Sequence, residues 1–202
     1  MMNIQKRSLL AGAAAALAGT GVTAAARTTP VVHQDPREQL RQRHFPNVPL
    51  VTHTGKEVRF YDDILKNQKV VINVMYTVCR NICTPVTQNM LEAQRLLGDF
   101  GKDINFYSIS LTPLDDDPAA LRAFMKAQHV EQGWTFLTGK PGDVELARRG
   151  LGFARSRPAD DADLSRHSGM LRIGNERMAS WGHASALTNG RAIARMIRFE
   201  LA

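Results

Sequence analysis

Apolar residues recur with two different periods along this chain, one typical of strands and one typical of helices. Two mostly apolar, β-branched runs, "KVVINVMY" at 69–76 and "INFYSISL" at 104–111, predict strands that are buried on both faces. After the first run, apolar residues continue at helical spacing up to Leu97, and Gly98 is placed to end that helix. Strands and helices therefore alternate from the first buried run onward.

Other stretches extend this alternation in both directions. "WTFLTG" at 134–139 predicts a short strand, and "DDDPAALRAFMKAQ" and "PGDVELARRGLG" predict helices whose first turns hold acids. Two further segments predict hairpins, "PLVTHTGKEVRF" at 49–60 and "SGMLRIG" with "ERMASW" at 168–181. "GRAIARMIRFEL" at 190–201 predicts a terminal amphipathic helix.

Together these elements predict an α/β sandwich. Parallel β-α-β connections followed by a late hairpin indicate a central mixed sheet flanked by helices, with the first hairpin as an N-terminal extension. Residues 27–49 contain four prolines and little periodicity, which predicts an extended lead-in with one short helical stretch near 37–43. We expect one domain over 50–202, a length that suits a single core.

The first 26 residues have the pattern of an export signal. Lys6 and Arg7 form a basic start, an alanine-rich apolar stretch follows at 8–19, and alanines at 24–26 suit a signal peptidase. We expect cleavage after Ala26 and a periplasmic or otherwise exported protein, and the basic pair leaves a twin-arginine export route open. Disulfides can persist in such a compartment.

Charge narrows the range of partners. The formal net charge is +7 at pH 7, and Lys6 and Arg7 contribute to it without any acid in the first 26 residues. The remaining basic residues form no large cluster and are not interleaved with aromatic residues. We therefore expect no nucleic-acid surface.

The two cysteines of the chain, Cys79 and Cys83, lie in "YTVCRNICTPV", directly after the first buried run. This pattern puts Cys79 in a loop and Cys83 at a helix start, where free N–H groups favour thiolate. A redox pair and a pair of metal ligands both remain open, whereas a structural disulfide across so short a loop would add little stability. A dithiol at this turn is the thioredoxin-like placement.

A metal ion held by these thiolates would need a further ligand. Zinc in a structural site requires four ligands, and the chain has no second cysteine pair, whereas soft thiolates select Cu(I). His167, in "LSRHSGMLRIG", is the leading candidate, because the segment entering the late strand of a thioredoxin-like sheet passes close to the dithiol loop. Met170 and His183 are further donors nearby, although a core methionine and a surface histidine are their ordinary roles.

Four segments, "YTVCRNICTP", "FYSISLTPLDDDPAALRAFM", "WTFLTG" and "RHSG", together resemble the SCO/SenC family of thioredoxin-like copper proteins. The resemblance extends over about 50–173. It implies that Cys79, Cys83 and His167 bind one copper ion, with Cu(I) favoured and Cu(II) open. It also implies delivery of copper to the CuA centre of cytochrome c oxidase, or reduction of the cysteines of that centre.

Three positions depart from the family pattern. Arg80 follows the first cysteine, and Thr84 separates the second cysteine from Pro85. Thr112 stands where many members carry Asp after the "SIS" strand, so a carboxylate that could help to hold Cu(II) is absent from that position.

Two functions follow as hypotheses. The first is a periplasmic copper metallochaperone that passes Cu(I) from Cys79, Cys83 and His167 to an acceptor such as cytochrome c oxidase subunit II. The alternative is a thiol-disulfide oxidoreductase that acts on periplasmic cysteines through Cys79 and Cys83, with a thiol reductant as a further partner. The chain is an enzyme only under the second hypothesis.

Overall fold

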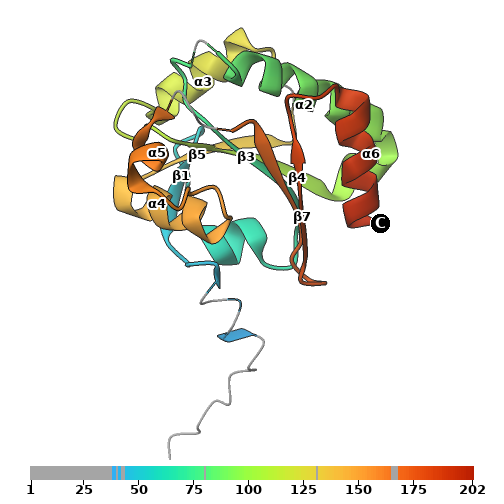
Figure 1. The fold of residues 1–202 in the computed structure, drawn as a ribbon, viewed down its shortest axis with the longest axis horizontal. Coiled ribbons are helices and arrows are strands. Elements are labelled where there is room, and N and C mark those ends of the chain that lie inside the picture. The colour runs from blue at the N-terminus through green and yellow to red at the C-terminus, as the bar shows by residue number, and fades with distance from the viewer. Residues whose placement is uncertain (1–37, 40, 42–43, 80, 131, 165–167) are drawn as a thin grey trace, which may run out of the picture. The chain divides into compact units, whose positions relative to one another are not determined.

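A seven-stranded mixed sheet forms the centre of the domain (Figure 1), with the strands in the order β2-β1-β5-β4-β3-β6-β7. The computed structural model describes residues 38–39, 41, 44–79, 81–130, 132–164 and 168–202. The strands of this part are β1 (Pro49–Thr52), β2 (Glu57–Arg59), β3 (Lys69–Met75), β4 (Ile104–Ser110), β5 (Trp134–Thr138), β6 (Met170–Asn175) and β7 (Ser180–Ser185). β3, β4 and β5 run parallel, whereas β1 and β6 run antiparallel to their neighbours.

Helices cover both faces of the sheet (Figure 1), as expected for an α/β sandwich. One face carries three α-helices, whose apolar residues share one core cluster: α2 (Cys83–Leu97), α3 (Pro118–Ala127) and α6 (Gly190–Leu201). The other face carries a π-helical segment, η1 (Phe60–Leu65), and α4 (Pro141–Gly150) over a second core cluster. The predicted fold class is confirmed.

Strand β3 shows why the central strands are so apolar in sequence. Its side chains alternate between the two cores: Val71 and Met75 pack with α2 and α6, whereas Val70, Ile72 and Val74 pack with η1 and α4. A strand that is covered on both faces needs an apolar side chain at nearly every position. Parallel pairing with β4 and antiparallel pairing with β6 place β3 inside the sheet, where it can position the residues that follow it.

The first predicted hairpin forms between β1 and β2, but the boundaries of the second one were wrong. The strand predicted at 176–181 begins at Ser180 and runs to Ser185. Residues 176–179 form the turn instead: Asn175 Oδ1 accepts a hydrogen bond from the N–H of Met178, and Ala179 has a φ of 52°. Glu176 is buried and binds groups outside the hairpin, which the local pattern does not reveal.

The periodicity predicts none of three short helical segments. These are η1, the 3-10 segment η2 (Gly98–Asp103) and α5 (Pro158–Ala162). None is longer than six residues, so none can show a helical repeat of apolar positions. The spacing of apolar residues therefore does not reveal helical segments that are shorter than two turns.

Of the first 49 residues, the structure describes 38–39, 41 and 44–49. The export signal at 1–26 and residues 27–37 of the lead-in lie outside the described residues. Of the helical stretch predicted near 37–43, Glu38, Gln39 and Arg41 are described and are helical. No helix in the described part of the chain is long and apolar enough to cross a membrane.

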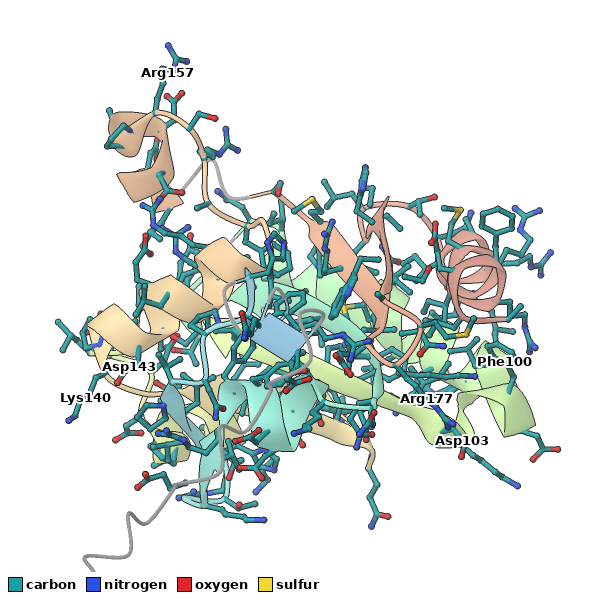
Figure 2. The ribbon with its side chains drawn as sticks, turned by 90° about the horizontal axis from the view of Figure 1, so that it is seen from below. Phe100, Asp103, Lys140, Asp143, Arg157 and Arg177 are labelled. Carbon is teal, nitrogen blue, oxygen red and sulfur yellow. The ribbon has the colours of Figure 1, made fainter. Side chains whose placement is uncertain are left out.

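Exposed charges are dispersed over separate elements (Figure 2). Lys140 lies at the start of α4, Arg157 at the start of α5 and Arg177 in the turn between β6 and β7. This arrangement agrees with the scattered basic residues of the sequence.

Candidate metal and thiol site

The two cysteines lie where the chain leaves β3 and enters α2. Cys79 belongs to the connecting loop, in which its N–H donates to the carbonyl of Tyr76 at 3.2 Å. Cys83 is the first residue of α2. Both thiols are free, and the residues are only 8% and 2% exposed, respectively. The loop-and-helix placement expected from the sequence is therefore present.

The start of α2 is fixed by local hydrogen bonds. The carbonyl of Ile82 accepts from the N–H of Val86 at 2.9 Å, and the hydroxyl of Thr87 donates to the carbonyl of Cys83 at 2.7 Å. Pro85 fits this first turn because the N–H that it lacks would have no partner within the helix. The N–H groups of the loop and of Cys83 remain available to the sulfurs.

The two thiols differ in acidity. Burial alone would raise the pKa of Cys79, but hydrogen bonds from the Cys83 thiol and from the N–H groups of Asn81, Cys83 and Ile82 bring that pKa below its usual value. Burial raises the pKa of Cys83, and its hydrogen bond to Cys79 and the nearby charge of Asp116 add to this effect. Cys79 is thus the better nucleophile, and Cys83 holds its proton.

Tyr76 is a site residue that the sequence reasoning missed. Burial and the hydrogen bond with Cys79 raise the pKa of the Tyr76 phenol to about 12. The hydroxyl is therefore protonated at neutral pH and donates to the Cys79 sulfur. Its position, directly after β3 and three residues before Cys79, was the available signal.

Asp116 is a second missed residue, and it supplies a carboxylate beside Thr112. The Asp116 side chain is fully buried and accepts four hydrogen bonds, from the N–H and hydroxyl of Thr77 and from the hydroxyls of Ser110 and Thr112. Its bonds to the two hydroxyls at the end of β4 measure 2.6 and 3.0 Å. A carboxylate therefore lies beside the Thr112 hydroxyl, and its oxygens are engaged in these four hydrogen bonds.

His167 lies outside the described residues, as does Arg80. The residues that follow His167 approach the start of α2. Ser168 and Ile82 line the same pocket, of about 310 Å³. A Cβ atom added to Gly169 would lie 3.1 Å from a methyl group of Val86. The chain therefore runs beside the first turn of α2 directly after the predicted third ligand.

Met170 and His183 line this same pocket, next to Ile82. The structure thus brings both candidate donors to the neighbourhood of Cys83. Among the described residues, no three His, Cys, Asp or Glu side chains form a group that could hold a metal ion. A complete site would need a thioether or a ligand from outside the described residues.

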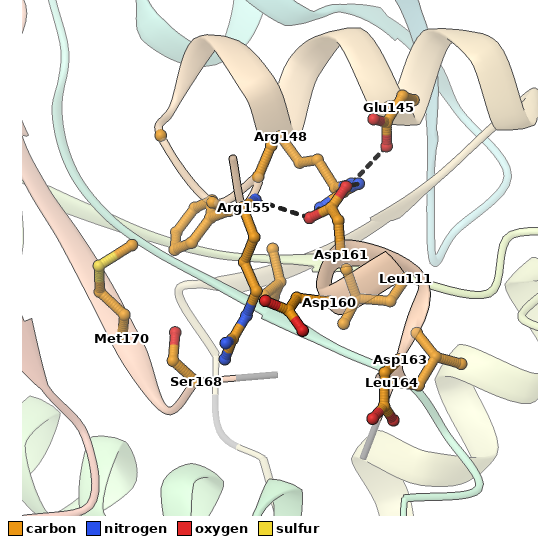
Figure 3. A pocket seen from close by; sticks show the side chains of 14 residues that line it. Leu111, Glu145, Arg148, Arg155, Asp160, Asp161, Asp163, Leu164, Ser168 and Met170 are labelled. Atoms are coloured by element: carbon orange, nitrogen blue, oxygen red, sulfur yellow. Dashed lines mark hydrogen bonds and ion pairs between the residues drawn. The ribbon is translucent and has the colours of Figure 1, made fainter. Parts of the chain in front are cut away.

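A second cavity, of about 480 Å³, opens beside α4 and α5 (Figure 3). Asp161 accepts from the guanidinium of Arg148 at 2.9 Å and from the N–H of Arg155 at 2.7 Å. The bond to Arg148, opposed by burial and helped by the N–H of Arg155, lowers the pKa of Asp161 to about 2. Glu145 also pairs with Arg148. These carboxylates are therefore engaged in ion pairs that hold α5 against α4.

Comparison with known proteins identifies the family. The SCO1/SenC family model matches residues 36–202. A SCO1 protein homolog of Bacillus subtilis (strain 168) is 31% identical over 86 residues, which are 42% of this chain and 44% of that protein. The chain thus aligns with less than half the length of this curated relative.

Solved structures show the same fold. Bradyrhizobium japonicum ScoI with copper bound is 20% identical, with a TM-score of 0.60, over 76% of this chain and 96% of that one. BsSco, a member of the Sco family of cytochrome c oxidase assembly proteins in which a disulfide switch was identified, is 22% identical. Its TM-score is 0.60, over 76% of this chain and 90% of that one. The predicted thioredoxin-like sandwich is confirmed. Since the family model spans the lead-in's end and the entire domain, the chain belongs to the SCO1/SenC family.

Proposed function

We propose that this protein is an exported copper metallochaperone that serves assembly of the CuA site of cytochrome c oxidase. One observation carries the proposal: two buried thiols are hydrogen-bonded to each other at the β3–α2 turn of a SCO1/SenC chain. Copper is the cargo, and the acceptor is a protein such as cytochrome c oxidase subunit II. Export depends on the signal pattern at 1–26.

The described residues fit Cu(I) as cargo. The loop thiolate of Cys79 and the helix-start sulfur of Cys83, which releases its proton on binding the ion, are soft ligands that select Cu(I) over harder ions. Burial of both sulfurs limits access of water, and His167 would add an imidazole from the segment that precedes Ser168 and Gly169. Ser168 and Gly169, which directly follow His167 in the chain, lie beside Ile82 and Val86, and this supports the assignment.

Each neighbouring residue has a separate task in this proposal. The Tyr76 hydroxyl donates to the Cys79 sulfur and holds it in place. Asp116 fixes the start of the loop through Thr77. Copper then moves by ligand exchange: sulfur and imidazole ligands of the acceptor replace Cys79, Cys83 and His167 one after another, without a change in the oxidation state of the ion.

An anaerobic Cu(I) titration of the reduced protein tests the proposal. We expect about one tightly bound ion per chain, and a loss of affinity of at least about tenfold in each of Cys79→Ser, Cys83→Ser and His167→Ala. His129→Asn is the matched control, because it removes an exposed imidazole and Asn tolerates the φ of 55° found there. Unchanged affinity in all three ligand variants would sink the proposal.

A second candidate function is thiol-disulfide exchange, which the unequal acidities of Cys79 and Cys83 favour. The Cys79 thiolate would attack a partner disulfide, and Cys83 would lose its proton and release the partner as a thiol. The cysteine pair is oxidised and the partner disulfide is reduced in this step. Measurement of the reduction potential separates the functions, since a pair unable to exchange with periplasmic dithiols excludes the reductase.

A further inference from the structure

A groove of about 410 Å³ runs between the cysteine loop and α3. Thr77, Cys79 and Thr84 form one wall. The other wall is formed by residues of α3 and the position after it: Ala120, Ala123, Phe124, Ala127 and Gln128. The groove therefore leads a partner from the outer surface of α3 to the Cys79 sulfur.

Cys79 is the sulfur that a partner can reach through this groove. Cys79 lines the groove and is the more exposed of the two cysteines, at 8% against 2% for Cys83. Both cysteines belong to one core cluster, but Cys83 does not line the groove and is in hydrogen-bonding contact with Cys79. Any exchange of a thiol or of copper with another protein therefore begins at Cys79.

The described residues that line the groove include no acidic or basic residue apart from the Cys79 thiol. Three of the eight present only a methyl group. At one end, the Gln128 amide donates to the Thr84 hydroxyl at 3.4 Å, and the Gln88 amide donates to the Gln128 carbonyl at 3.0 Å. Short walls with hydroxyl and amide groups at the end suit a peptide backbone in an extended conformation, and the described residues of these walls include no Lys, Arg, Asp or Glu to pair with a charged ligand.

Two exposed apolar side chains belong to segments that are attached to the groove wall. Val78, directly before Cys79, is 70% exposed, and Leu114 is 84% exposed. Leu114 lies two residues before Asp116, which binds Thr77 in the groove wall. Large apolar side chains that are exposed beside a reactive group are typical of a protein interaction surface.

We propose that this groove binds an extended, uncharged segment of the acceptor protein and presents a cysteine of that segment to Cys79. The inference rests on the proposed function, because it assumes that Cys79 exchanges its copper or its sulfur bond with another protein. It goes further by assigning the docking surface, the entry sulfur and the kind of segment that docks there.

A blocked-cysteine assay tests the groove without copper. The probe is a short peptide of Gly, Ser and Val with one central cysteine in a disulfide with nitrothiobenzoate, and N-acetylcysteine amide with the same blocking group is its small counterpart. The Cys79 thiolate forms a bond to the cysteine sulfur of the probe, the probe disulfide breaks, and nitrothiobenzoate leaves as a coloured thiolate with the electron pair. Cys83 then loses its proton, bonds to Cys79 and releases the probe as a thiol.

The variant Ala123→Leu with Ala127→Leu fills the groove, and Ala123→Gln is a milder version. Ala119→Leu, at an exposed position of α3 that does not line the groove, is the matched control. We expect the wild type to react roughly tenfold faster with the peptide than with the small probe. The filled variants should lose this preference and keep their rate with the small probe within about twofold, and the control should match the wild type.

Two outcomes overturn the inference: equal wild-type rates with both probes, or a peptide preference that survives in both filled variants. Circular dichroism of every variant shows that the domain is folded, and Ala123→Gln decides the matter if the double variant does not fold. The Cu(I) titration is independent of this assay. Copper binding without peptide preference rejects the groove alone, whereas peptide preference without copper binding rejects the metallochaperone alone.

Discussion

Asp116 and Thr77 are 39 residues apart in the chain, yet the Asp116 carboxylate accepts hydrogen bonds from both the N–H and the hydroxyl of Thr77. The same carboxylate binds the hydroxyls of Ser110 and Thr112 at the end of β4. It thereby joins the loop that carries Cys79 to the neighbouring parallel strand.

Replacing Asp116 with Asn should lower the free energy of unfolding by about 1–3 kcal/mol, since an amide cannot accept all four hydrogen bonds. Copper affinity should also fall, because the loop loses its attachment to β4. Urea denaturation and Cu(I) titration measure the two effects. Asp117→Asn is the control, because Asn serves equally well at the N-cap of α3, where Asp117 accepts from the N–H of Ala120. Equal stability of the two variants would contradict the role of Asp116.

Gly169→Ala should destabilise the domain by about 1–3 kcal/mol through overpacking. The added Cβ would lie 2.8 Å from the side chain of Leu187 and 3.1 Å from that of Val86. Because Gly169 is two residues from His167, we also expect weaker copper binding. Gly142→Ala in the first turn of α4 is the control, since its Cβ would meet nothing within 4 Å. Thermal unfolding of both variants checks the difference, and a neutral Gly169→Ala would show that the exposed Leu187 side chain can move aside.

Asp161 should make the free energy of unfolding vary with pH in the acidic range. Its pKa is about 2 in the folded protein and 3.8 as a reference value, so the unfolded chain binds more protons between these two limits. The contribution of Asp161 is therefore fully present above pH 3.8 and is lost as the pH falls toward 2. Urea denaturation at a series of pH values should show a shallower acid slope for Asp161→Asn than for the wild type.

Asp115→Asn provides the comparison for this pH series, because Asp115 is exposed in the turn before α3. Its slope should follow that of the wild type. An unchanged slope for Asp161→Asn would mean that the ion pair with Arg148 contributes nothing in solution.

Glu176→Gln should cost about 1–3 kcal/mol of stability and leave copper binding unchanged. The buried Glu176 carboxylate accepts from the Tyr61 hydroxyl at 3.1 Å and from the Asn67 N–H at 2.7 Å, and it pairs with Arg41 at 3.2 Å. Glu57→Gln, at an exposed position of β2, should have almost no effect. Hydrogen exchange near Arg41 reports whether the lead-in is released from the domain. A change in copper affinity would contradict the expectation that the Glu176 contacts are independent of the thiol site.

The central strands and long helices could be predicted because their pattern is local. In β3, Val71 and Met75 face one core, and Val70 and Ile72 face the other. The apolar residues of this strand alone therefore predict that both of its faces are buried. Asp117 and Asn189 likewise cap their helices within three residues. The β6–β7 turn could not be predicted in the same way, because the buried partners of Glu176 come from distant parts of the chain.

Some residues of the site could likewise be recognised from the local sequence, whereas others are placed there by long-range contacts. Cys79 and Cys83 were recognisable because only three residues separate them, at a strand–helix junction. Asp116 was read as part of a helix start, and only its long-range bonds to Thr77 give it a place beside the thiols. Tyr76 looked like the end of an apolar run, and its hydroxyl contact with Cys79 depends on how the loop turns back.

Glu176 and the cysteine loop lie at opposite ends of β3. Asn175 pairs with Lys69 at the start of β3, whereas the cysteine loop follows Met75 at the end of that strand. Arg41 and Glu38 are therefore attached at one end of a seven-residue strand, and Cys79 lies beyond the other end, roughly 20 Å away. A partner that binds at the cysteine loop therefore approaches the end of β3 opposite to the one where Glu38 and Arg41 are attached.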